Sequence, residues 1–126
     1  MTDGATLKIK AQIMLGDEIA MGPGKAALLE AITREGSISA AGRALGMSYR
    51  RTWMLVDTMN RCWAQPLVET AAGGRHGGGA RLTEAGARVL AHYRAIEAQL
   101  GDAQEGTDWG VLRGLLRDLP EPSRST

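Results

Sequence analysis

Gly46 divides residues 37–60 into two short helical patterns, and this division constrains the fold more than any other feature. Ser37 and Ser39 can both accept hydrogen bonds from the free N–H groups that open the first pattern. Gly46 ends it, because a residue without Cβ adopts the left-handed conformation at little cost. Ser48 then caps a second helix of roughly three to four turns. The pattern predicts two helices joined by a tight turn, a helix-turn-helix.

The second predicted helix has an apolar face and a basic, aromatic N-terminal turn. Positions i, i+4, i+7 and i+11 form a stripe that is predicted to be buried: Thr52, Val56, Met59 and Trp63. The remaining side chains lie opposite this stripe or on its flanks: Tyr49, Arg50, Arg51, Trp53, Met54, Asp57 and Arg61. In a helix-turn-helix the second helix enters the DNA major groove, so the exposed first turn is predicted to contact DNA. For Trp53 and Met54, core packing and base contact both remain open.

Two short strand patterns follow the second helix. Residues 67–70 (LVET) and 80–82 (ARL) are predicted to pair across the loop AAGGRHGGG, which is expected to be flexible. A hairpin directly after a recognition helix is the wing of a winged helix, and it is expected to meet the phosphate backbone or the minor groove. Thr83 then caps a further helix.

The residues before the helix-turn-helix complete the predicted fold. Apolar and polar residues alternate from Leu7 to Leu15, the period-two pattern of a half-buried strand. Pro23 suits the first turn of a helix that continues to Gly36. The sequence therefore predicts a fold that is mainly α with a small β component. It is a winged helix-turn-helix with an N-terminal strand and a long C-terminal dimerisation helix.

The helix predicted from Glu84 to about Leu100 carries an apolar arc too wide for the wing to cover. It is expected to pair with a second copy of the chain or to pack against residues 108–119. Those residues form a short amphipathic helix whose simplest expected position is on its own domain, with dimer completion or partner binding as alternatives. Residues 101–107 are predicted to be a linker, and the polar tail is expected to be disordered. The domain division is 1–100 for the winged helix and 101–126 for linker, helix and tail.

The net charge of +1 is distributed unevenly along the 126 residues. Residues 1–33 carry −1, residues 34–94 carry +5, and residues 95–126 carry −3. The positive charge thus lies on the segment predicted to meet phosphate, as electrostatic steering requires. The alternative is that this segment is an ordinary surface of mixed charges with no role in binding phosphate. The apolar share of 44% and the length fit one small domain.

Catalytic, metal and membrane patterns are missing from the sequence. The two histidines, His76 and His92, have no Cys or carboxylate cluster at metal-ligand spacing. The glycine-rich loop lacks the Gly-Lys-Ser/Thr ending of a P-loop, and no Gly-x-Ser-x-Gly elbow occurs. We therefore expect no enzyme, no metal and no cofactor. There is no apolar run of about 18 residues and no signal peptide, and the lone Cys62 fits a reducing cytoplasm.

Residues 7–100 resemble the N-terminal domain of the ModE-type molybdate-responsive transcriptional regulators, relatives of the LysR-type winged helices. The motifs that carry the resemblance are GSIS (36–39), GMSYRRTW (46–53), Met59 with Asn60, LVET (67–70) and GGRHGGGARLTEAG (73–86). The resemblance implies a homodimer that binds a palindromic operator in double-stranded DNA and regulates transcription. Full-length relatives also carry C-terminal β-barrels that bind molybdate, and residues 101–126 do not resemble their oxyanion motif. We therefore expect a stand-alone DNA-binding protein, and molybdate responsiveness is not carried over.

The predicted DNA contacts divide by role. Arg50 is expected to read a base edge, because its fork matches guanine O6 and N7. Tyr49 is expected to stack on or hydrogen-bond to sugar and base edges, with Met54 beside it. Phosphate contacts are expected from residues near the two helix starts: Ser37, Ser39, Ser48 and Arg51. The wing is expected to contribute three more residues: Arg75, His76 and Arg81.

Two other functions fit the same pattern. A winged helix that binds protein would use the apolar helices at 84–100 and 108–119. A sensor of an oxyanion or a metal would place its ligand at the dimer interface, although the sequence offers no ligand cluster and the effector is unknown.

Overall fold

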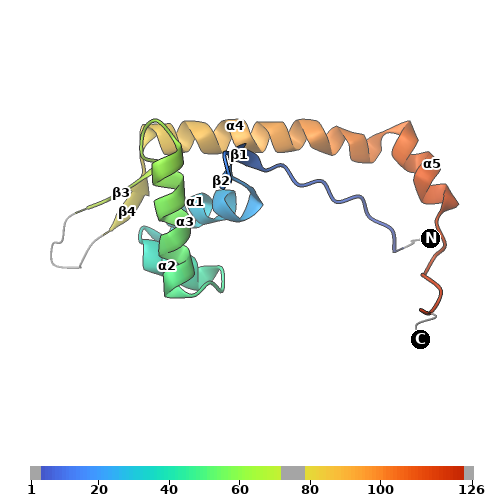
Figure 1. Cartoon of the computed structure of the whole chain (residues 1–126), viewed down its shortest axis with the longest axis horizontal. Helices are drawn as coiled ribbons and strands as arrows, with labels where there is room; N and C mark the ends of the chain where they lie inside the picture. The colour runs from blue at the N-terminus through green and yellow to red at the C-terminus, as the bar shows by residue number, and fades with distance from the viewer. Residues whose placement is uncertain (1–3, 72–78, 124–126) are drawn as a thin grey trace.

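The computed structural model describes residues 4–71 and 79–123. Within these ranges the chain forms a head of helices and hairpins and an arm, in which a long helix leaves the head and bends at its far end (Figure 1). The head contains β1 (Ile13–Leu15), β2 (Glu18–Met21), α1 (Pro23–Glu35), α2 (Ile38–Ala44), α3 (Tyr49–Cys62), β3 (Val68–Thr70) and β4 (Ala80–Leu82). The arm contains α4 (Glu84–Gly101), the 3-10 helix η1 (Asp102–Glu105) and α5 (Thr107–Leu115).

Helix α1 forms the centre of the head, where α2, α3, α4 and β4 all contact it. Five of its apolar residues are fully buried: Ala26, Leu28, Leu29, Ala31 and Ile32. Pro23 occupies the first turn, and Gly36 ends the helix with φ of 74°, as the sequence predicts. The same core continues through Ile38, Ala41, Val56 and Met59 of α2 and α3, through Leu67 before β3, and through Tyr93 of α4. Helix α1 is therefore the platform that holds α2, α3 and the wing in place.

The N-terminal strand is shorter than predicted and belongs to a hairpin. Only Ile13–Leu15 of the predicted stretch 7–15 is a strand, and it pairs antiparallel with β2 across a turn in which Gly16 has φ of 60°. The preceding residues are extended and are held by distant side chains. The Tyr93 hydroxyl donates to the Ala11 carbonyl at 2.7 Å, and the Gln104 amide donates to the Leu7 carbonyl at 2.6 Å. The alternation of apolar and polar residues therefore predicted an extended segment correctly, but it predicted a longer strand than the one that forms.

The predicted wing is present as β3 and β4, an antiparallel pair with Val68 opposite Leu82 and Thr70 opposite Ala80. Thr83 caps α4 by accepting a hydrogen bond from the Gly86 N–H at 2.9 Å, as expected for this position. Gly86 is also where α4 comes closest to the wing, because a Cβ there would collide with the Leu67 carbonyl. These features confirm a winged helix-turn-helix that is mainly α, with an N-terminal strand and a long C-terminal helix.

The arm is joined to the head by an ionic contact. The Arg94 guanidinium donates to both Glu30 oxygens, at 3.0 and 2.7 Å, and to a Glu97 oxygen at 2.6 Å. Because this hydrogen bond favours the ionised carboxylate, the pKa of Glu30 lies below its ordinary value. The contact ties α4 to α1 and helps to set the direction in which the arm leaves the head.

Two predictions about the end of the arm are wrong. The expected linker at 101–107 is largely the helical turn η1, which continues from α4. The expected docking of the last helix on its own domain does not occur, since α5 has no buried residue. The large apolar side chains in and just after α5 are exposed: Val111, Leu112, Leu115, Leu116 and Leu119. In the described part of the chain, no helix is both long and apolar enough to cross a membrane.

Candidate nucleic-acid interface

Two serine caps and two glycines set the geometry between α2 and α3. Ser37 caps α2 by accepting from the Ala40 N–H at 3.0 Å, and Ser48 caps α3 by accepting from the Arg51 N–H at 3.1 Å. Ser39 was predicted to share the capping role, but it lies within the first turn of α2 and Ser37 is the cap. The turn contains Gly46 at φ of 72°, as predicted.

The two helices touch most closely at Gly42, which the sequence analysis missed. A Cβ at Gly42 would overlap the Thr52 side chain, which is itself buried and donates to the Ser48 carbonyl at 2.8 Å. The spacing between α2 and α3 therefore depends on glycine at this position. Ala41, one position earlier, is fully buried.

Helix α3 presents the faces that its periodicity predicts. Thr52, Val56 and Met59 are buried, and Trp63 is half-buried with its indole N–H donating to the Ala20 carbonyl at 3.0 Å. Tyr49 and Met54 are exposed over 69% and 56% of their surfaces. Trp53 is 37% exposed, so it is a surface residue and not part of the core.

The basic side chains on α3 differ in how they are neutralised. Arg61 donates to Asp57 at 2.8 Å and lies 3.9 Å from Glu18, so intrachain carboxylates neutralise its charge. Arg50 and Arg51 are exposed and form no salt bridge with any residue in the described ranges. The unneutralised charge of α3 is therefore at its first turn, next to the Ser48 cap.

One basic residue near this turn escaped the sequence analysis. Lys25 is 8% exposed in the first turn of α1. Burial lowers the pKa of its ammonium group, and the nearby Arg51 guanidinium lowers that pKa as well. The sequence alone does not reveal that Lys25 lies near Arg51, because their proximity depends on how α1 packs against α3.

The wing carries an ion pair on its paired strands. Arg81 on β4 donates to Glu69 on β3 at 2.7 Å, and the Arg81 side chain is 80% exposed. Glu69 therefore already neutralises the charge of Arg81, which fits a residue that supports the wing better than one that contacts DNA directly. Arg75 and His76, the predicted wing-tip contacts, lie outside the described residues.

Asn60 connects the recognition helix to the wing, a role that the sequence analysis missed. Its side-chain oxygen accepts from the backbone N–H groups of Leu67 and Val68 at 2.8 and 3.1 Å. Its amide group donates to the Val68 carbonyl at 3.1 Å. The signal in the sequence was an amide in the last turn of a helix, where Asn is unfavourable unless it bonds to nearby backbone.

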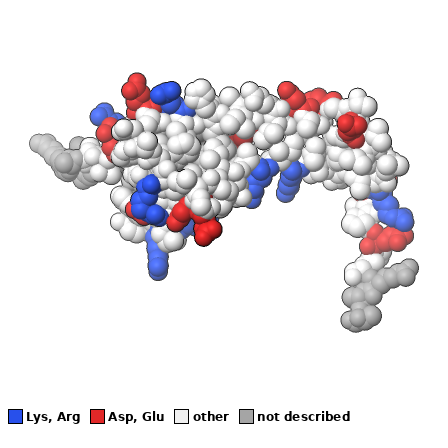
Figure 2. Space-filling model, turned by 45° about the horizontal axis from the view of Figure 1, so that its top comes forward, with Lys and Arg blue, Asp and Glu red and all other residues white. Residues whose placement is uncertain are grey.

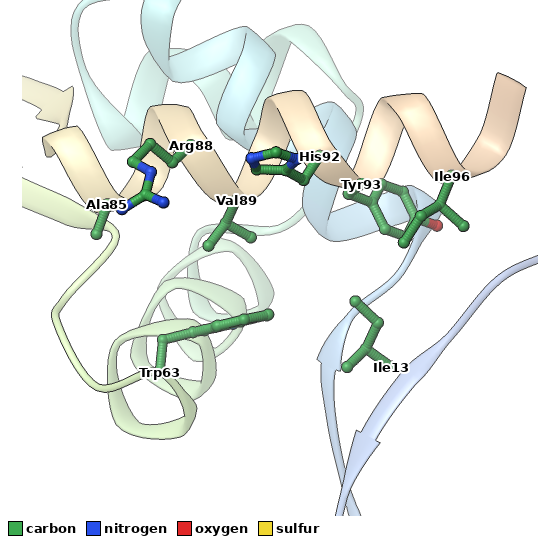
Figure 3. A pocket seen from close by; sticks show the side chains of 8 residues that line it. All are labelled: Ile13, Trp63, Ala85, Arg88, Val89, His92, Tyr93 and Ile96. Carbon is green, nitrogen blue, oxygen red and sulfur yellow. The ribbon is translucent and has the colours of Figure 1, made fainter.

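An apolar groove lies at the base of the arm. Figure 3 shows α4 above it and Trp63 and Ile13 below it. The α4 side chains that line it are Ala85, Arg88, Val89, His92, Tyr93 and Ile96. The Trp63 indole N–H and the Tyr93 hydroxyl already donate to the Ala20 and Ala11 carbonyls, which leaves Arg88 and His92 as the polar side chains without such a bond in the described lining, so the lining suits another apolar surface better than an anion. No group of three or more His, Cys, Asp or Glu in the described residues could hold a metal ion.

Acidic side chains are concentrated at the far end of the arm. In Figure 2 they gather there, whereas the head carries basic and acidic side chains side by side. The acidic end corresponds to η1 and the first turn of α5, which contain Asp102, Glu105 and Asp108. The uneven charge seen along the sequence is therefore also uneven in space.

Comparison with known proteins places this arrangement among bacterial regulators. The family model for bacterial regulatory helix-turn-helix proteins of the lysR family matches residues 25–87. The chain is 46% identical over 99 residues to the molybdenum-pterin-binding protein MopA of Rhodobacter capsulatus, covering 79% of this chain and 35% of MopA. It is 50% identical over 76 residues to the molybdenum transport protein ModE of Azotobacter vinelandii, covering 60% of this chain and 28% of that protein.

A third relative is similar over almost the whole chain. The DNA-binding transcriptional dual regulator ModE of Escherichia coli K12 is 36% identical over 122 residues, covering 94% of this chain and 47% of that regulator. The chain thus spans less than half the length of these three relatives.

Proposed function

Because this chain belongs to the lysR family of bacterial regulatory helix-turn-helix proteins, we propose that it regulates transcription by binding a palindromic operator as a homodimer. The observation that carries this proposal is the first turn of α3. There Tyr49, Arg50 and Arg51 are exposed, and neither arginine has a carboxylate partner in the described ranges. Regulation of bacterial genes also implies a cytoplasmic protein.

The proposed reading of DNA begins with α3 in the major groove. Arg50 donates its fork to guanine O6 and N7, which identifies one base pair. Tyr49 contacts sugar and base edges, and Met54 adds apolar contact on the exposed face of the same helix. These contacts supply sequence information, whereas contacts to phosphate supply position.

The serine caps suit the phosphate-binding role. Each cap hydroxyl of Ser37 and Ser48 accepts a backbone N–H, and its own hydrogen stays available to donate to a phosphate oxygen. Helix N-termini also favour anions. Arg51 and Ser39 lie beside these two helix starts. Arg75 and His76 extend the proposed contact along the wing, and Arg81, whose charge Glu69 neutralises, supports them.

The groove along α4 is the proposed dimer surface. It is apolar, it lies away from the first turn of α3, and it continues along the arm into the exposed Ile96 and Leu100. Two copies joined through α4 would present two recognition helices to major grooves about 34 Å apart, on one face of the DNA. The alternative prediction, that residues 108–119 of the same chain cover α4, is not met, because α5 is exposed.

The test is a genome-wide capture of DNA fragments by the purified chain at moderate salt, with and without molybdate. We expect enrichment of a palindromic site whose affinity falls steeply with salt. If no site is enriched, the chain is not a sequence-specific regulator. Weak binding that hardly depends on salt would instead support a protein-interaction module. A molybdate-dependent change in the enriched sites would identify molybdate as an effector, which the resemblance alone does not establish.

Single variants then test the assigned roles. Arg50→Ala should cost roughly 1–3 kcal/mol on the operator and loosen specificity at one base pair. Arg51→Ala should weaken specific and random DNA alike. Arg117→Ala, which removes the same charge from a residue after α5, is the matched control and should leave affinity nearly unchanged. Equal losses on specific and random DNA for Arg50→Ala would mean that Arg50 contacts only phosphate.

A further inference from the structure

Trp53 is a large apolar side chain exposed beside the basic turn of α3. Its surface is 37% exposed, although the buried stripe of α3 is complete without it. Its ring lies 6.1 Å from the ring of Tyr49, centroid to centroid, with the planes inclined at 54°. Within the described residues, the indole N–H donates no hydrogen bond. Exposed aromatic surface of this kind, next to unneutralised arginines, suggests contact with a ligand that is both anionic and partly apolar.

The two sides of Trp53 suit different parts of such a ligand, one the anionic part and the other the bases. On one side it faces a groove bordered by Ser37, Ser39 and Thr70, whose hydroxyls suit a phosphate backbone. On the other side it lies on the same helical turn as Tyr49 and Arg50, which face outward. The indole therefore lies between the wall suited to phosphates and the face suited to base edges.

We infer that Trp53, supported by Tyr49, recognises the C5-methyl group of a thymine in the major groove. This inference rests on the proposed DNA-binding function. Among the base edges in the major groove, only thymine carries an apolar group. The ring of Tyr49 packs against the indole and limits its freedom, so less conformational entropy is lost on contact. Because Arg50 and Trp53 are neighbours on α3, the thymine should lie within one or two base pairs of the guanine that Arg50 reads.

The test replaces each thymine of the captured operator by deoxyuridine, one at a time, which removes the methyl group and nothing else. One buried methyl group corresponds to about a fourfold change in affinity. We expect the wild-type chain to lose about fourfold at one thymine in each half-site, close to the base pair that Arg50→Ala relaxes. If no position responds, the inference is wrong even though the regulator proposal stands. If capture yields no operator, it is the proposed function that fails.

Variants at Trp53 show whether the response belongs to this residue. In Trp53→Ala the deoxyuridine penalty should disappear, whereas Trp53→Phe keeps an aromatic surface and should retain most of it. Val111→Ala, which removes an exposed apolar side chain from α5, outside the proposed DNA contacts, should leave the penalty unchanged. A penalty that persists in Trp53→Ala would overturn the inference. So would a Trp53→Phe variant that loses affinity equally on all sequences, because that result would indicate an indole hydrogen bond to the backbone.

Discussion

Replacing Asn60 by alanine tests whether one side chain fixes the wing on the recognition helix. The change removes three hydrogen bonds, two accepted from the N–H groups of Leu67 and Val68 and one donated to the Val68 carbonyl. Each such bond contributes about 1 kcal/mol net. Leu67 and Val68 are 0% and 4% exposed, so water cannot easily replace the lost partner. We therefore expect Asn60→Ala to lower the free energy of unfolding by about 3 kcal/mol.

Urea unfolding followed by circular dichroism measures this loss. All variants must be compared at one protein concentration, because the stability of the proposed dimer would depend on concentration. Gln65→Ala is the matched control, since it removes an exposed amide from the connection between α3 and β3. Such a surface change should stay within about 0.5 kcal/mol. A loss below about 1 kcal/mol for Asn60→Ala would refute the argument that Asn60 fastens the wing.

Three further predictions concern the arm. Gly86→Ala puts a methyl group against the Leu67 backbone carbonyl, so it should lower the free energy of unfolding by about 1–3 kcal/mol. Urea unfolding measures this loss, and an unchanged midpoint would contradict the close packing at Gly86. The Arg94 hydrogen bond lowers the pKa of Glu30 from 4.5, so its stabilising effect is present above that pH and is lost as the pH falls through the folded-state pKa. Arg94→Gln should therefore reduce the acid-induced loss of stability, and an equal loss in both proteins would show that this contact contributes little. Val89→Asp should weaken the dimer by about 100-fold in sedimentation experiments, whereas Ala98→Asp, on the opposite side of α4, should not. Equal effects of the two aspartates would remove the groove from the proposed interface.

Much of the fold could be predicted because its signals are local. Helix α1 begins at a proline and ends at a left-handed glycine, and the starts of α2, α3 and α4 are marked by Ser37, Ser48 and Thr83. A cap needs only neighbours three residues away, so the residue type at one position is informative. The buried stripe of α3 follows from its periodicity in the same way.

The parts that could not be predicted depend on contacts between distant residues. The N-terminal segment is held by Tyr93 and Gln104, which lie 82 and 97 residues further along the chain than their partners. The pairing of β1 with β2 depends on a turn that apolar alternation alone does not show. The last helix has an amphipathic pattern, but the pattern does not say which surface covers it.

The residues of the candidate site also divide into those set by local sequence and those set by contacts between distant residues. The outward positions of Tyr49 and Arg50 follow from the helical repeat of α3. Trp53 lies on the flank of that repeat, so whether it is buried depends on where α2 and the wing lie. Asn60 has its role because the chain returns to α3 after Pro66, and Lys25 approaches Arg51 only through the packing of α1.

The most direct test of the account is hydroxyl-radical and methylation footprinting of the captured operator with the purified chain. We expect two protected major-groove segments on one face of the DNA, related by the palindrome and centred about 34 Å apart. Val89→Asp should lose the paired protection at protein concentrations where the wild-type chain retains it. A single protected segment, or two segments that Val89→Asp protects just as well, would contradict a dimer joined through α4 that reads one half-site with each recognition helix.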